Sequence, residues 1–124
     1  MTGTLDSYGL ALQNGVPLAA ICDANGFGVF LSDTNALTLG QWHHMAFTFD
    51  ATTGLESLYT DGAMVASANA GKLMNFDNHP LLLGADNDNT LPDNFLNGQI
   101  DEASIYNRAL TANEIVSIYN VGTS

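Results

Sequence analysis

The side chains of this sequence best suited to bind a metal ion or a ligand are acidic. They are concentrated in two segments. Asp101 and Glu102 are adjacent in a segment that is otherwise mostly apolar. Alternation along a strand would put Asp101 on the face that also carries Ala103 and Ile105, and Glu102 on the opposite face. Because an unpaired carboxylate on a buried face costs free energy, Asp101 needs a partner, and a metal ion is one candidate.

The second acidic place is the loop Asp86-Asn87-Asp88-Asn89-Thr90, in which carboxylate and amide oxygens alternate. Such oxygens suit calcium, which takes about six to eight of them. The loop is not an EF-hand, because Leu91 stands where the glycine is needed and Asn97 where the closing glutamate is needed. We therefore take Asp86 and Asp88 as candidate ligands for calcium or for sugar hydroxyls, with a solvated turn as the alternative.

The elements that must position these acids are predicted to be short strands followed by one helix. Asn14-Gly15 and Asp61-Gly62 each separate two apolar runs, which is typical of type I′ hairpins. Strands are expected over residues 8–13, 16–22, 27–32, 43–49, 55–60, 63–68, 81–84 and about 97–106. Regularly spaced short strands and a single terminal helix predict an all-β fold, an antiparallel β-sandwich with one short C-terminal helix.

The single helix is predicted from the capping box that Thr111 and Glu114 can form. Leu110 and Ile115 have the spacing of a hydrophobic staple, which fixes how the chain enters a helix. The helix is expected to run over residues 112–119, with Gly122 ending it.

Charge and composition limit what the chain can bind. Residues 1–124 are predicted to form one domain, and the apolar fraction of 46% fits an ordinary globular core. Lys72 and Arg108 are the only lysine and arginine against 13 acids, which gives a net charge of -11. Nucleic acid is therefore a poor partner and anionic membrane surfaces are excluded, whereas cations, neutral sugars and basic proteins remain. From its composition we expect neither a signal peptide nor a transmembrane segment in this sequence.

Four motifs occur in an order that resembles a known family. They are a tryptophan-histidine segment, a Tyr-x-Asp-Gly hairpin, a short leucine-rich strand and an Ile-Asp-Glu segment with a trailing helix. In this sequence they read Gly40-Gln41-Trp42-His43-His44-Met45-Ala46, Leu58-Tyr59-Thr60-Asp61-Gly62, Leu82-Leu83-Gly84-Ala85 and Gly98-Gln99-Ile100-Asp101-Glu102. About the last two-thirds of the chain thus resembles the laminin G-like members of the concanavalin A-like lectin/glucanase superfamily.

The resemblance implies a jelly-roll sandwich that recognises carbohydrate or a protein surface, usually outside the cell or at its surface. In that family an acid at the position of Asp101 often helps to hold a structural calcium, together with backbone carbonyls and an acid from the first strand. Calcium is therefore a candidate cofactor at Asp101, and backbone N–H groups or Arg108 are the alternative partners of this carboxylate. The hydrolases of the superfamily carry an alternating Glu-x-Asp-x-Glu strand, which this chain lacks, so no enzymatic activity is expected.

The beginning of the chain departs from the family pattern, in which further strands usually come first. We expect the resulting gap to be covered by self-association, most simply in a symmetric homodimer, or in part by residues 1–7. The alternative function is therefore a structural module for oligomerisation or for capture of a partner strand.

Aromatic rings are the remaining candidates for contact with a sugar. Because adjacent residues of a strand face opposite ways, His43 and His44 cannot chelate one metal ion, and we expect them to pack within the sandwich with Trp42. The rings that could stack on a sugar, with core packing as the alternative for each, are Tyr59, Phe76, Phe95 and Tyr106.

Overall fold

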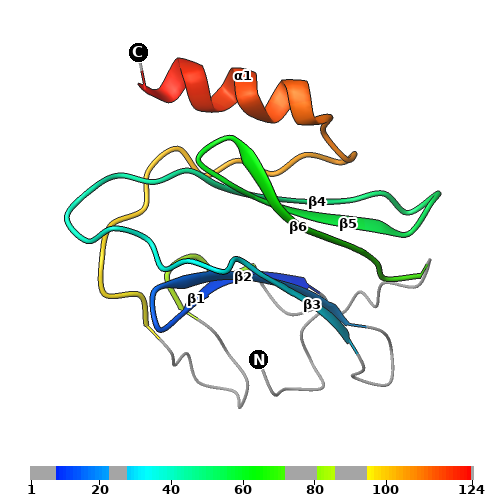
Figure 1. The fold of residues 1–124 in the computed structure, drawn as a ribbon, viewed down its shortest axis with the longest axis horizontal. Coiled ribbons are helices and arrows are strands. Elements are labelled where there is room, and N and C mark those ends of the chain that lie inside the picture. Colours follow the sequence, from blue (N-terminus) through cyan, green and yellow to red (C-terminus); the bar gives the residue numbers. More distant parts are fainter. Residues whose placement is uncertain (1–7, 23–27, 72–80, 86–94, 124) are drawn as a thin grey trace.

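The computed structural model describes residues 8–22, 28–71, 81–85 and 95–123. Within this part, two antiparallel three-stranded sheets face each other, and one helix lies across the outer side of the second sheet (Figure 1). Sheet A has the order β1-β2-β3 and sheet B the order β4-β5-β6. The elements are β1 (Tyr8–Gln13), β2 (Val16–Cys22), β3 (Gly28–Ser32), β4 (Met45–Phe49), β5 (Leu55–Thr60), β6 (Ala63–Asn69) and α1 (Ala112–Thr123). The predicted fold class, an antiparallel sandwich with a C-terminal helix, is confirmed.

Two of the connections are the predicted type I′ hairpin turns. Asn14 and Gly15 have φ values of 52° and 79°, and Asp61 and Gly62 have 49° and 81°. This turn type needs positive φ at both central residues, which explains why each turn has Asn or Asp followed by Gly. The turns fix the registers Gln13↔Val16 and Thr60↔Ala63.

The core between the sheets is made by residues of β2, β3 and β5. Ala19 of β2, Leu31 of β3 and Leu58 of β5 form its buried cluster, and Phe47 and Ala66 pack against it. Leu58 pairs with Phe47 on one side and with Ala66 on the other, so one row of sheet B faces sheet A. Alternation directs the next residues along β5 to the opposite face, towards the helix.

Helix α1 begins as predicted. The Glu114 N–H donates to Thr111 Oγ1 at 3.2 Å, and the Thr111 N–H donates to Glu114 Oε1 at 3.1 Å. These two bonds are the reciprocal capping box. Leu110 and Ile115 are buried together with Tyr59 of β5, which confirms the staple and docks the helix on sheet B.

The end of α1 was predicted wrongly. The helix continues to Thr123, and Gly122 lies inside it without the positive φ that a terminating glycine adopts. With 12 residues, α1 is too short to cross a bilayer, and none of the helices in the described ranges has the length and apolar character to do so.

Two predicted strands are absent from the described residues at their expected places. Residues 97–106 pair with no described strand, and Glu102 has a φ of 55°, which interrupts an extended chain. Residues 81–84 bend at Gly84, whose φ is 81°, and leave Leu81 and Leu83 more than half exposed. Both segments have the composition of strands, but a strand also needs a neighbour that accepts its backbone hydrogen bonds.

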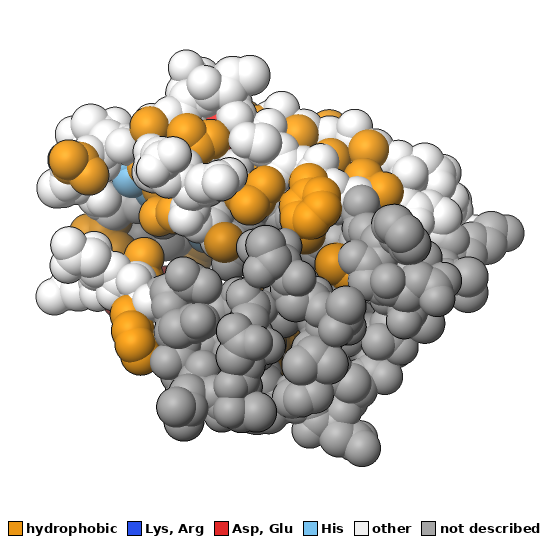
Figure 2. Space-filling view, turned by 90° about the horizontal axis from the view of Figure 1, so that it is seen from below, with side chains coloured by type: hydrophobic (Ala, Val, Ile, Leu, Met, Phe, Trp, Pro, Cys, Tyr) orange, Lys and Arg blue, Asp and Glu red, His pale blue; other side chains and the backbone are white. Residues whose placement is uncertain are grey.

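Sheet A carries no Asp, Glu, Lys, Arg or His in any of its strands. Seen from this side of the molecule, many of the described side chains are hydrophobic; some His is in view, with no Lys or Arg and hardly any Asp or Glu (Figure 2). Tyr8, Leu10 and Leu12 of β1 are each about two-fifths exposed. Among the described residues, the acidic side chains therefore lie outside the strands of sheet A.

Candidate functional site

The candidate site is a hollow between two irregular segments, residues 81–85 and 95–103. The Leu96 N–H donates to the Gly84 carbonyl at 2.7 Å, which ties the segments together. The hollow has a volume of about 400 Å³, the size of a small-ligand site. We call it the acidic hollow; its lining residues are Leu83, Gly84, Leu96, Gly98, Ile100, Asp101, Glu102 and Ala103.

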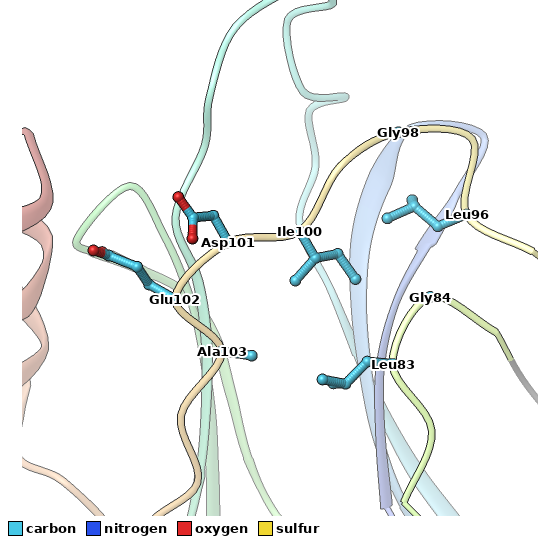
Figure 3. Close-up of a pocket in the computed structure, with 8 residues that line it drawn as sticks. All are labelled: Leu83, Gly84, Leu96, Gly98, Ile100, Asp101, Glu102 and Ala103. Carbon is cyan, nitrogen blue, oxygen red and sulfur yellow. The ribbon is translucent and has the colours of Figure 1, made fainter.

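The acidic hollow has an apolar side and a charged side. In Figure 3 the side chains of Leu83, Leu96 and Ile100 converge, whereas the carboxylates of Asp101 and Glu102 lie on the other side and point away from them. The conformation of Glu102 explains this arrangement, because its positive φ turns the chain out of the extended form. Asp101 and Glu102 therefore do not project to opposite faces, as the strand prediction required, and Figure 3 shows both carboxylates on the side away from the apolar residues.

Asp101 is exposed and does not sit on a buried apolar face. The alternative partner proposed for it, Arg108, is engaged elsewhere: its Nη1 donates to Glu114 Oε1 at 2.9 Å. That guanidinium lowers the pKa of Glu114 to about 2, and the carboxylate in turn raises the pKa of Arg108. Asp101 thus keeps its oxygens available to solvent or to a ligand.

The acidic hollow offers two oxygen-bearing side chains that a metal ion could use. Asp101 and Glu102 give two carboxylates, but within the described ranges no third His, Cys, Asp or Glu joins them in a metal-binding group. Calcium would need further oxygens from backbone carbonyls, water or other segments. The other predicted ligands, Asp86 and Asp88, lie outside the described residues. What the two carboxylates can do as they stand is accept hydrogen bonds from hydroxyl or ammonium groups.

A second polar arrangement, which the sequence did not reveal, joins the histidines to the β5–β6 turn. Asp61 Oδ2 lies 2.8 Å from His43 Nδ1, and the Thr38 carbonyl lies 3.0 Å from His43 Nε2. Asp61 Oδ1 accepts the N–H of His44 at 2.9 Å. Because both ring nitrogens of His43 face acceptors, its doubly protonated form fits best, and neither nitrogen is free to act as a base.

The pKa values agree with this assignment. The hydrogen bond to Asp61 is the largest influence on His43 and raises its pKa. Burial opposes ionisation of Asp61, but the hydrogen bonds from His43 and His44 outweigh it and lower the pKa of Asp61. The contact between His44 and Asp61 could have been found from the hairpin register, since Met45↔Thr60 places these two residues opposite each other.

A family model described as the concanavalin A-like lectin/glucanases superfamily matches residues 2–116. The chain belongs to this superfamily. The match covers almost the whole chain and confirms the resemblance drawn from the four motifs. No curated protein matches the chain.

Two solved structures show the same superfamily fold. An S-layer domain-containing protein from Clostridium thermocellum is 24% identical with a TM-score of 0.57, and the match covers 85% of this chain and 52% of that one. A heptameric SAP-like pentraxin from Limulus polyphemus is 12% identical with a TM-score of 0.53, over 90% of this chain and 55% of that one. The chain therefore spans about half the length of both, and at these identities the likeness concerns the fold alone.

The aromatic residues of this superfamily member divide into buried and exposed rings. Tyr59 is only 3% exposed beneath α1, so it packs and cannot stack on a sugar. Phe95 and Tyr106 are 73% and 51% exposed, and Phe76 lies outside the described residues. Trp42, which was expected to pack within the sandwich, is 66% exposed, so that prediction was wrong.

A second hollow of about 410 Å³ lies beside α1. It combines the Tyr106 ring with the Arg108–Glu114 ion pair and with Asn113 of the first helical turn. We call it the Tyr106 hollow. It is a competing place for a ligand and serves below as the internal comparison for the acidic hollow.

Proposed function

We propose that this chain is a non-catalytic recognition domain that binds carbohydrate or a protein surface in the acidic hollow, outside the cell or at its surface. The observation that carries the proposal is that Asp101 and Glu102 line one side of a hollow whose other side is lined by apolar side chains. An apolar wall with a few polar groups is the usual composition of a ligand pocket.

The chemistry of the acidic hollow selects among ligands. Its two carboxylates accept hydrogen bonds and repel anions, and the net charge of -11 acts in the same direction. Neutral hydroxyl-rich molecules and cationic groups are therefore favoured. A sugar could place its hydroxyls on Asp101 and Glu102 and its apolar ring face against the leucine and isoleucine side chains, and a lysine-bearing protein segment could use the same groups.

Calcium is part of the proposal as a bridging ion. Asp101 and Glu102 are oxygen donors of the kind calcium prefers, and a sugar supplies hydroxyl oxygens that can complete its coordination. Asp86 and Asp88 remain proposed ligands on the strength of their sequence. In this arrangement calcium strengthens sugar binding, and its removal with a chelator weakens binding.

The decisive experiment is a glycan-array screen with and without calcium, followed by calorimetry of the strongest hit. The double change Asp101→Asn/Glu102→Gln should weaken binding by at least about tenfold, because it replaces two charged acceptors with amides. Tyr106→Ala, which alters only the Tyr106 hollow, is the matched control and should leave affinity unchanged. The opposite pattern would move the site to the Tyr106 hollow, and no binding to any glycan or basic peptide would contradict a recognition role.

A second candidate function is assembly through β1. This strand lies at the edge of sheet A, and no described strand pairs with its outer side. In a two-residue hairpin the residues flanking the turn form a hydrogen-bonded pair, here Gln13 and Val16. The N–H and C=O groups of Tyr8, Leu10 and Leu12 then point away from β2, towards the open edge.

The edge of β1 is self-complementary. Two antiparallel copies of β1 can pair with Leu10 opposite Leu10 and Tyr8 opposite Leu12, which joins their half-exposed apolar side chains on one face. Two copies of a chain with a net charge of -11 repel each other. The strands of sheet A carry no charged side chain, which favours pairing through β1. The proposed product is a symmetric homodimer.

Assembly can be separated from ligand binding by sedimentation over a wide concentration range. Leu10→Lys places a charge on the edge and should convert dimers to monomers. Leu39→Lys is the matched control, since Leu39 is 93% exposed and lies outside β1. A wild-type mass equal to one chain at every concentration would contradict assembly.

A further inference from the structure

The interior of the sandwich contains a carboxylic acid. Glu56 lies on β5 between Phe49 of β4 and Ala68 of β6, two residues from Leu58 and on the same face. Its exposed fraction is 0%. The side chain therefore projects from sheet B into the space that faces sheet A.

Glu56 has no polar partner among the described residues. Neither Oε1 nor Oε2 accepts or donates a hydrogen bond. Among Asp, Glu, Lys, Arg and His, it is also the only residue in any of the six strands. Buried polar groups in folded proteins are nearly always hydrogen-bonded, so an orphaned carboxyl group calls for an explanation.

The elements packed against Glu56 offer no counter-ion. The neighbouring strands β4 and β6 contain no acid or base, and neither do β2 and β3, which contact β5 across the core. Other titratable side chains of the strands lie elsewhere: Tyr59 and Cys22 alternate to the outer faces of their sheets, and Tyr8 lies on the edge strand. No described group can therefore compensate a negative charge at Glu56.

We propose that Glu56 makes closure of the sandwich proton-dependent, so that the two sheets pack tightly over the neutral acid and loosen when it ionises. An isolated carboxylate in an apolar interior is far less favourable than the neutral acid. Burial accordingly raises the pKa of Glu56 from 4.5 to about 7. The inference is independent of the ligand and assembly proposals above.

The direction of the pH effect follows from proton binding. Between pH 4.5 and about 7 the folded chain holds a proton on Glu56 that the unfolded chain has released. The stabilisation is complete below pH 4.5, decreases as the pH rises through this range, and is lost above about pH 7. The contribution of Glu56 therefore makes the folded chain more stable in a mildly acidic medium than in a neutral or alkaline one.

The test compares urea unfolding of the wild type and of Glu56→Gln from pH 4 to 9. The ratio of their unfolding constants, wild type over variant, should rise by up to about tenfold per pH unit and by roughly 300-fold in total, levelling off above about pH 7. Taking the ratio cancels the contributions of the other acids. Glu102→Gln makes the same chemical change at an exposed glutamate and serves as the control for the substitution itself.

Two parallel curves for wild type and Glu56→Gln would overturn the proposal. If the buried amide prevents folding, Glu56→Leu serves in its place, because leucine neither titrates nor needs a hydrogen-bond partner. Its ratio to wild type should change with pH in the same way. A pH-independent difference for Glu56→Leu would equally overturn the proposal.

Discussion

Two glutamates on opposite sides of sheet B have pKa values shifted in opposite directions. On the inner face Glu56 is buried without a hydrogen bond, and its pKa rises to about 7. On the outer side, at the start of α1, Glu114 accepts from Arg108 and from the Thr111 N–H, and its pKa falls to about 2. One carboxyl group is favoured as the neutral acid and the other as the anion.

The two pKa shifts differ because Glu114 has partners nearby in the sequence, whereas the surroundings of Glu56 come from distant parts of the chain. Arg108, Thr111 and Glu114 lie within seven consecutive residues, so this part of the chain carries its own polar partners. Glu56 meets its surroundings only when two sheets from distant parts of the chain close over it. Local sequence can supply a cap, whereas it cannot guarantee a partner inside a sandwich.

The largest loss of stability is expected for a substitution on the inner face of sheet B. Leu58 has an exposed fraction of 0% in the cluster between the sheets. Leu58→Ala should lower the free energy of unfolding by about 3 kcal/mol, through lost burial and the cavity left behind. Urea denaturation measures it, and a loss below about 1 kcal/mol would mean that this cluster is not the main core.

The next effect concerns the contact of α1 with the β5–β6 turn. A Cβ on Gly62 would stand 2.8 Å from Cδ1 of Tyr119, and Gly62 also has positive φ. Gly62→Ala should cost about 2–3 kcal/mol. Gly40→Ala shares the positive φ but has no atom within 4 Å, so it should cost only about 1 kcal/mol. Equal losses would show that Tyr119 does not pack on the turn.

A smaller effect is expected at the helix start. Thr111→Ala removes the hydroxyl that accepts the Glu114 N–H and should cost about 1 kcal/mol. Thr111→Ser keeps that hydroxyl and should retain most of the stability. If serine lost as much as alanine, the cap would not be the cause.

The smallest effect concerns the His43–Asp61 pair. His43 has a raised pKa, so its contribution to the stability of the folded chain is complete below pH 6.5 and is lost as the pH rises through the raised value. Asp61 has a lowered pKa, so its contribution is present above pH 3.8 and is lost as the pH falls through the lowered value. Asp61→Asn should therefore destabilise most between these limits, as thermal unfolding at several pH values can measure. A difference from wild type that does not change with pH would argue against the ion pair.

Local motifs were the part of the fold that the sequence could predict. Asn14-Gly15 and Asp61-Gly62 form type I′ turns because their own backbones allow positive φ at both central positions. The capping box and staple at Thr111 likewise need only neighbouring residues. Each of these predictions depends on a few adjacent side chains, and each is confirmed.

Predictions that needed a distant partner were less successful. Residues 97–106 have an apolar alternation, but no described strand pairs with them, and nothing in their composition signals the positive φ of Glu102. That one dihedral angle changes the candidate site, because it brings Asp101 and Glu102 to the same side. The sequence placed Glu56 in a strand correctly, but which face of the strand would be enclosed depends on how the sheets stack.

The contrast between the two faces of sheet B can be measured directly by NMR. The chain has only three glutamates, Glu56, Glu102 and Glu114, so selective labelling gives three side-chain carboxyl signals to follow from pH 2 to 9. We predict a midpoint near 7 for Glu56 and near 2 for Glu114. A Glu56 signal that titrates near 4.5, the ordinary value for an exposed glutamate, would contradict a carboxyl group enclosed without a partner between the sheets.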